Sequence, residues 1–70
     1  MGNVRYEFLI PVRLSDTARA AFPELKAGAA PTGGGTALWG PVHDNAELAG
    51  LLARFATLGL TVVEMRMLPD

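Results

Sequence analysis

The sequence predicts an α+β domain with the element order β-α-β-β-α-β, the ferredoxin-like arrangement of a four-stranded antiparallel sheet with two helices on one face. Three observations predict it. Apolar residues alternate near both ends of the chain, a capped amphipathic helix fills residues 44–59, and a triple glycine joins two extended segments in the middle. With 70 residues and no cysteine, the chain is expected to form a single domain over residues 1–70 without disulfides. Because so short a chain buries little apolar surface, self-association is expected to add burial.

The first element is a strand over residues 4–14, in which apolar side chains recur at every second position. The even-numbered positions carry Val4, Tyr6, Phe8, Ile10, Val12 and Leu14, and the odd-numbered positions carry Arg5, Glu7, Leu9, Pro11 and Arg13. A period of two predicts a strand with one face on a core and the other turned outward. Proline cannot donate a backbone hydrogen bond, so Pro11 is expected near the end of the strand.

A short helix is expected next, with Ser15 as its N-cap and Asp16 in its first turn. Ala18, Ala21, Phe22 and Leu25 have the spacing of one helix face. Because Pro23 disfavours the helical conformation at the residue before it, the helix is expected to run for about two turns.

Residues 26–42 are expected to form a hairpin. Lys26–Thr32 is a poor strand, interrupted by Gly28 and Pro31 as edge strands often are, and it pairs with residues 36–42. The segment Thr32-Gly-Gly-Gly-Thr36 is rich in glycine like a phosphate-binding loop, but it lacks the Gly-Lys-Ser/Thr ending and precedes a strand. A hairpin turn is therefore the interpretation adopted.

The second helix has the strongest signals. Asp44 stands three residues before Glu47, as in a capping box, and Gly59 supplies the residue just past the helix end. Gly50 is expected at a close helix contact. The last strand is expected over residues 60–68, with Thr61, Val63, Met65 and Met67 on one face and Val62, Glu64, Arg66 and Leu68 on the other. Met65 and Met67 are expected to fill the core.

In this topology the first and third strands lie at the centre, with the last strand beside the first. The two helices cover one face and leave the other open. Parity places on the open face the apolar anchors Leu9, Trp39 and Val62 in a frame of Arg5, Glu7, Glu64 and Arg66. Such a patch is typical of an interaction surface, and the favoured partner is a second copy of the chain in a homodimer. The alternative is that a bulge near Gly40 turns Trp39 into the core.

The charge and hydropathy of the chain limit the kinds of partner that it is expected to bind. The chain has six basic residues, scattered singly, and seven acidic residues, so nucleic acid is not an expected partner. No apolar stretch is long enough to span a bilayer, and no secretory signal is recognised, so a cytoplasmic location is expected. Another protein or a small-molecule ligand is a further candidate partner.

His43 is the one candidate for catalysis, since it is the single histidine and stands beside Asp44. The competing interpretation, which is favoured, makes it a solvated loop residue, because Asp44 already serves as a helix cap. One histidine and no cysteine do not supply the three or four ligands of a usual metal site, and neither a metal nor a cofactor is expected.

Residues 40–60 resemble small stand-alone actinobacterial proteins that share the pattern Gly-Pro-Val-x-Asp-x-Ala-x-Leu-x-Gly-Leu-Leu-Ala-Arg, here Gly40 to Arg54. That group is uncharacterised, so the resemblance implies no activity. The helix-strand piece Leu-Gly-Leu-x-Val-x-Glu, residues 58–64, is also similar to ACT regulatory domains, which implies a small-molecule-binding or pairing role.

The leading hypothesis is a non-catalytic, self-associating accessory or regulatory module that docks through its open sheet face. The alternatives are a small cofactor-independent enzyme of the dimeric α/β-barrel type, with His43 as acid or base, and an ACT-like small-molecule sensor.

Overall fold

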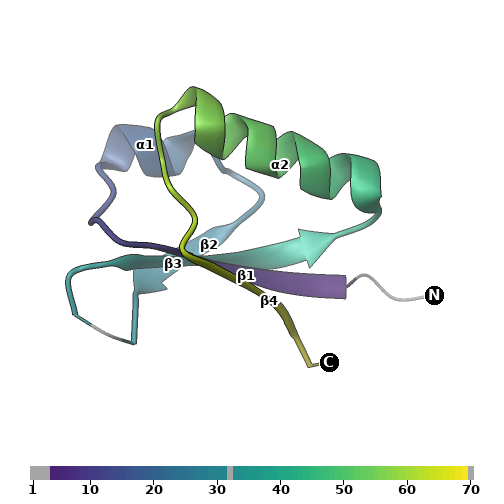
Figure 1. Ribbon diagram of the computed structural model, residues 1–70, viewed down its shortest axis with the longest axis horizontal. Coiled ribbons are helices and arrows are strands. Elements are labelled where there is room, and N and C mark those ends of the chain that lie inside the picture. Colours follow the sequence, from purple (N-terminus) through teal and green to yellow (C-terminus); the bar gives the residue numbers. More distant parts are fainter. Residues whose placement is uncertain (1–3, 32, 70) are drawn as a thin grey trace.

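A computed structural model describes residues 4–31 and 33–69 of the chain. Within these ranges the chain forms a four-stranded antiparallel sheet and two helices in the predicted order β-α-β-β-α-β (Figure 1). The elements are β1 (Val4–Ile10), α1 (Asp16–Ala20), β2 (Lys26–Ala29), β3 (Thr36–Val42), α2 (Asn45–Thr57) and β4 (Glu64–Leu68).

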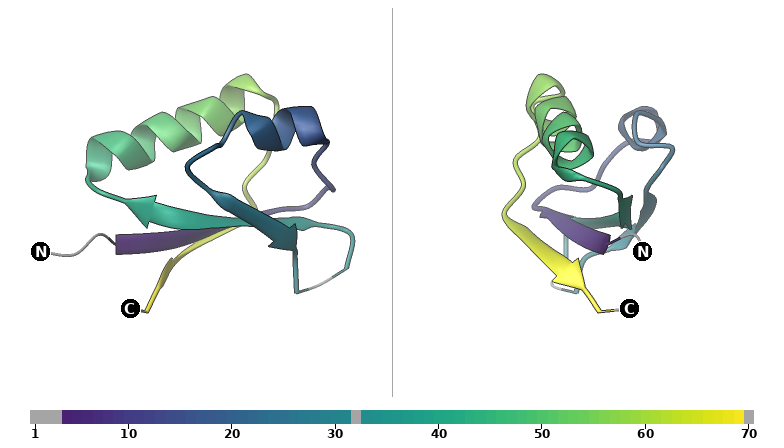
Figure 2. Two further views of the ribbon diagram at one scale, coloured as in Figure 1. Left: turned by 180° about the vertical axis from the view of Figure 1, so that it is seen from behind. Right: turned by 90° about the vertical axis from the view of Figure 1, so that its right-hand side faces the viewer.

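The strands are arranged in the order β2-β3-β1-β4, and each neighbouring pair is antiparallel. The first and third strands therefore occupy the centre and the last lies beside the first, as predicted. Both helices lie on the same side of the sheet, so the molecule has two layers and an open sheet face (Figure 2).

The first strand ends at Ile10, four residues earlier than predicted. Pro11 follows it directly, and from there the chain is held by the buried side chain of Thr36 instead of by a strand ladder. The Thr36 hydroxyl donates to the carbonyl of Val12 at 2.9 Å and accepts from the N–H of Leu14 at 3.1 Å. One side chain thus satisfies two backbone groups where the ladder stops.

The last strand begins at Glu64, not at residue 60. The chain first descends from α2 to the sheet, and on the way Leu60 and Val62 pack against the core. Gly59, with φ of +72°, starts this descent just past the helix end, as predicted. The strand predicted at 26–32 ends at Ala29, and Thr32 lies outside the described residues.

The helices begin where the capping residues predicted. Ser15 Oγ accepts from the N–H of Ala18 at 3.1 Å, and Asp44 Oδ1 accepts from the N–H of Glu47 at 2.8 Å. Gly50 was wrongly expected at a close contact: it is exposed, and a Cβ built there meets nothing within 4 Å.

The core lies between the sheet and the helices and centres on three phenylalanines. Phe55 of α2 stacks on Phe22 with 4.5 Å between ring centroids and tilts against Phe8 of β1 at 5.3 Å. Gly40 is required beside this core, because a Cβ there would lie 2.9 Å from the carbonyl oxygen of Glu24. The α1–β2 connection can therefore lie directly on β3.

Candidate functional site

The open face is built from rows of residues that the strand register places opposite one another. In an antiparallel ladder, directly opposed residues project from the same face. The rows on this face are Lys26–Trp39–Glu7–Arg66, Gly28–Ala37–Leu9–Glu64 and Pro41–Arg5–Leu68. Six of the seven residues predicted for an interaction face are thus brought onto one surface.

Trp39 lies near the middle of the open face. Its neighbour Leu38 is 1% exposed and points into the core, so Trp39 projects from the other side of β3, where it is half-buried. Its ring lies across β2, since a Cβ on Gly28 would be 3.1 Å from Trp39 Cη2. The register continues unbroken through Gly40, so the alternative in which a bulge turns this ring into the core is wrong.

Charged groups frame the indole ring. Arg66 Nε donates to Glu7 Oε1 at 2.8 Å, across the ladder from β4 to β1. Arg5 Nη2 donates to the carbonyl of Pro69 at 2.9 Å. The Glu7 side chain is only 14% exposed, whereas that of Arg66 is 56% exposed. The guanidinium of Arg66 is therefore anchored at one nitrogen and available to solvent at the others.

Val62, the seventh predicted residue, does not belong to this face. The prediction assumed that the alternation of a strand ran from residue 60, but Val62 precedes β4 and packs against the core. Outside a ladder, parity no longer determines which side a residue faces.

Met65 and Met67 were wrongly predicted to be core. They face the helix side, opposite Phe8 and Tyr6, yet they are 42% and 60% exposed. Val63, one residue before β4, is also 60% exposed. Met65 and Met67, the β4 row, lie along the edge of the sheet, and no feature of the sequence indicated that they were uncovered.

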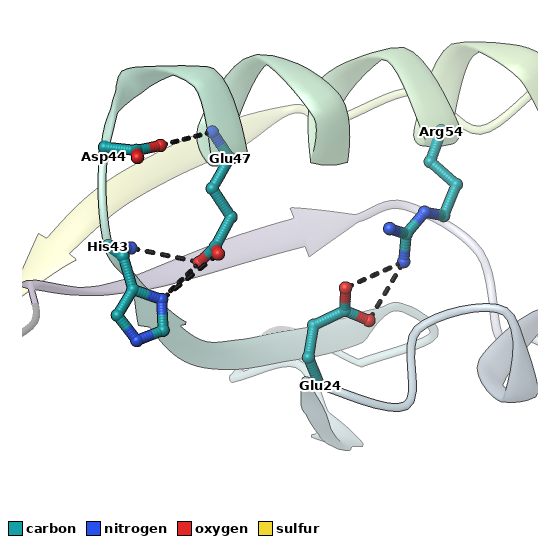
Figure 3. A network of polar contacts seen from close by, with 5 residues as sticks. All are labelled: Glu24, His43, Asp44, Glu47 and Arg54. Carbon is teal, nitrogen blue, oxygen red and sulfur yellow. Dashed lines mark hydrogen bonds and ion pairs between the residues drawn. The ribbon is translucent and has the colours of Figure 1, made fainter.

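His43 takes part in the cap of α2 (Figure 3). Its backbone N–H donates to Glu47 Oε1 at 3.0 Å, and its ring Nδ1 lies 2.9 Å from the same oxygen. The hydrogen bond from the His43 side chain, joined by that from its backbone, lowers the pKa of Glu47. Asp44, Glu47 and His43 thus form a reciprocal cap, which accounts for this cluster structurally.

A hollow of about 160 Å³ lies beside this cap, lined among others by Tyr6, His43 and Leu48. Sites for small molecules commonly have volumes of roughly 300–1,000 Å³. The hollow next to the catalytic candidate is thus smaller than such a site.

Arg54 has a role that the sequence did not indicate. From α2 its Nη1 donates to the carbonyl of Ala21 at 2.9 Å. The same nitrogen donates to both carboxylate oxygens of Glu24, at 2.9 and 3.0 Å (Figure 3). Its guanidinium also lies 5.3 Å from the centroid of the Phe22 ring. The hydrogen bond from Arg54 lowers the pKa of Glu24. Arg54 therefore fastens α2 to the α1–β2 connection, 30 residues away in sequence.

A larger hollow of about 570 Å³ lies between α1 and the β2–β3 hairpin. Arg13, Ser15 and Arg19 line it on one side, and Gly33–Gly35 line it on the other. Both arginines are exposed, and Arg19 pairs only loosely with Asp16 at 3.9 Å. Asp16 also lines the hollow, so the rim of this open depression carries two cationic groups and one carboxylate.

Two further observations apply to residues 4–31 and 33–69. No group of three or more His, Cys, Asp or Glu side chains is placed to hold a metal ion. Neither helix is long and apolar enough to cross a membrane.

In a comparison with known families, the model of a domain of unknown function, DUF8691, matches residues 5–66. Comparison with curated proteins and with solved structures finds no match. The matched range contains the three rows of the open face up to Arg66.

Proposed function

The chain belongs to the DUF8691 family, and we propose that the domain is a non-catalytic, self-associating module that docks through its open face. Its role is accessory or regulatory, and its first partner is a second copy of itself. The observation that carries the proposal is the position of Trp39: a half-buried indole near the middle of a sheet face that the helices leave uncovered.

The surroundings of Trp39 support docking by a protein surface. Leu9 and Trp39 form a half-buried apolar centre, and exposed Arg5, Glu64 and Arg66 surround it. An apolar centre with a charged rim is the usual anatomy of a protein–protein interface, and tryptophan and arginine are the residues most enriched at its energetic centre. Two open faces can pack about a twofold axis, as sheets do in β-sandwiches.

We further propose that the fold is of the ferredoxin-like class and that the protein acts in the cytoplasm. The element order and the two helices on one face support the first proposal. The absence of cysteine suits a compartment in which disulfides are not used for stability.

Light scattering during size-exclusion chromatography tests the docking proposal. Truncating a desolvated tryptophan anchor costs at least about 2 kcal/mol, so Trp39→Ala should weaken association roughly 30-fold. The matched control is Leu52→Ala, which truncates a side chain 37% exposed on α2, on the other side of the sheet. Unchanged association of Trp39→Ala, with its circular dichroism intact, would contradict the proposal.

A second candidate function is that of a small-molecule sensor, and the 570 Å³ hollow favours it. Arg13 and Arg19 at its rim would select an anionic ligand, such as a carboxylate or phosphate compound. A thermal-shift screen with amino acids and phosphate compounds tests this: a ligand at 100 times its Kd adds about 2.7 kcal/mol of stability. Loss of the shift in Arg13→Ala would assign the ligand to this hollow.

The third alternative, an enzyme with His43 as acid or base, receives less support. The His43 ring is 2.9 Å from the Glu47 carboxylate in the helix cap, and the adjoining hollow is small.

A further inference from the structure

We propose that β4 pairs with β4 of a second copy, antiparallel about a twofold axis that passes beside Met65, so that two sheets join into one. This contact goes beyond the proposed docking of open faces, because it uses the edge of the sheet and leaves Trp39 free.

The first argument is the position of β4 in the sheet. In the order β2-β3-β1-β4 it pairs with β1 on one side and forms the sheet edge on the other (Figure 2). An edge strand presents backbone N–H and C=O groups that a further strand can pair with. Proteins often protect such an edge with a bulge or an inward-pointing lysine. Over Glu64–Leu68 the register with β1 is regular, and the side chains of the β4 row are apolar.

The second argument is the exposure of the β4 row. Met65 and Met67 are 42% and 60% exposed, and the register with β1 places both on the helix side of the strand. Val63, just before the strand, is 60% exposed. Three exposed apolar side chains within five residues are an unfavourable surface for a domain this small. A second β4 laid alongside would cover part of Met65 and Met67.

The third argument is that charge selects the occupant and the register. With Met65 on the axis, Glu64 lies opposite Arg66 of the partner subunit, and the reciprocal pair forms by symmetry. On the other side of the strands, Met65 meets its own copy. Opposite charges and apolar pairs directly across an antiparallel ladder are stabilising.

Neighbouring registers are less favourable. An axis through Glu64 or Arg66 places like charges opposite one another. If the axis passes between residues 65 and 66, Met65 lies opposite Arg66 of the partner subunit. The apolar side of one strand would then share a face with the charged side of the other. A second copy in the Met65 register is therefore the occupant that the sequence of β4 fits.

The ion pair within each copy strengthens this register. Arg66 uses Nε to donate to Glu7, so its Nη groups can donate to a second carboxylate. In the paired edge that carboxylate is Glu64 of the partner subunit. Each arginine then joins two acidic side chains in a network, which stabilises more than an isolated surface pair does.

The register can be tested with single cysteines introduced into this cysteine-free chain, by measuring how fast each forms a disulfide-linked dimer. Met65→Cys places two thiols opposite each other, where Cα atoms about 4.5–5.5 Å apart suit a disulfide. Met67→Cys is the matched control, since the same residue type on the same side of β4 would lie roughly 14 Å from its copy. With a mild oxidant, Met65→Cys should form disulfide-linked dimer at least tenfold faster than Met67→Cys. Equal rates, or no linked dimer from Met65→Cys, would overturn the proposal.

A charge-exchange experiment provides a second readout in case the cysteine variants perturb the strand. Glu64→Arg alone places arginine opposite arginine, and Arg66→Glu alone places glutamate opposite glutamate. Neither variant alone should therefore pair through β4. Mixed, they should form a one-to-one heterodimer, because both cross-strand pairs are again of opposite charge. A mixture that associates no better than either variant alone would overturn the proposed register.

Two further variants separate this contact from open-face docking. Met65→Lys should abolish edge pairing and leave docking through Trp39 intact, whereas Trp39→Ala should do the reverse. Val12→Lys is the control for an added charge, because Val12 is 51% exposed and held to β3 through Thr36. If the β4 amides of Met65→Lys exchange no faster than those of Val12→Lys, edge pairing is contradicted whatever Trp39→Ala does.

Discussion

Replacing Arg54 with alanine should destabilise the domain by about 2 kcal/mol, because three contacts of its guanidinium are lost together. The half-buried hydrogen bond to the carbonyl of Ala21 is worth about 1 kcal/mol. The ion pair with Glu24 joins side chains 38% and 39% exposed, so it contributes only about 0.5 kcal/mol. The contact with the Phe22 ring adds about 0.5 kcal/mol.

Thermal unfolding followed by circular dichroism measures this loss. In a domain of this size 1 kcal/mol corresponds to roughly 4–8 °C in Tm, so Arg54→Ala should lower the Tm by roughly 8–16 °C. Arg54→Lys is the matched control: it keeps the charge but loses the planar group over the Phe22 ring, so its Tm should lie between those of the unmodified chain and Arg54→Ala. A loss below about 0.5 kcal/mol would refute the view that this arginine fastens α2 to the α1–β2 connection.

Three further predictions concern the fold. Gly50→Ala should stabilise the domain by about 1 kcal/mol, because an added Cβ meets nothing within 4 Å. Gly40→Ala should destabilise it, because its Cβ would clash with the Glu24 carbonyl. Urea unfolding measures the free energy of unfolding of both variants, and equal values would contradict this difference. Thr36→Val should cost about 1–3 kcal/mol by the same assay, since it leaves two backbone groups unpaired, and a neutral result would contradict that role. The lowered pKa values of Glu24 and Glu47 mean that their contributions are complete above the ordinary value of 4.5 and are lost as pH falls through the folded values. Tm should therefore fall on acidification below that value, and less steeply in Glu24→Gln; an identical acid slope in that variant would be inconsistent with the assigned cause.

Local signals in the sequence were sufficient for the order of the elements and for the helix boundaries, but not for the ends of the strands. Ser15, Asp44 and Gly59 predicted helix boundaries because capping depends on side chains within a few residues of the boundary. Parity predicted the side on which Trp39 lies, since its strand is regular from Thr36 to Val42. The rows of the open face follow from the same regularity.

The residues that were misplaced depend on tertiary structure. Val62 was misplaced because the chain between α2 and β4 is not a strand, and the sequence does not mark where the ladder begins. Met65 and Met67 were misplaced because parity gives the side of a strand but does not show that a helix fails to cover its edge. The link from Arg54 to Glu24 spans 30 residues and has no periodic signal.

The proposed docking of open faces can be followed through Trp39, the single tryptophan of the chain. Its fluorescence reports its own surroundings, and pairing at the β4 edge would leave those surroundings unchanged. The concentration series therefore uses Met65→Lys, which does not pair at the β4 edge. As light scattering shows its mass rise from 7.4 kDa with concentration, the emission maximum should shift to shorter wavelength in step with the mass. An emission maximum that stays constant while the mass rises would show that the indole is not covered on association, and would contradict the proposed interface.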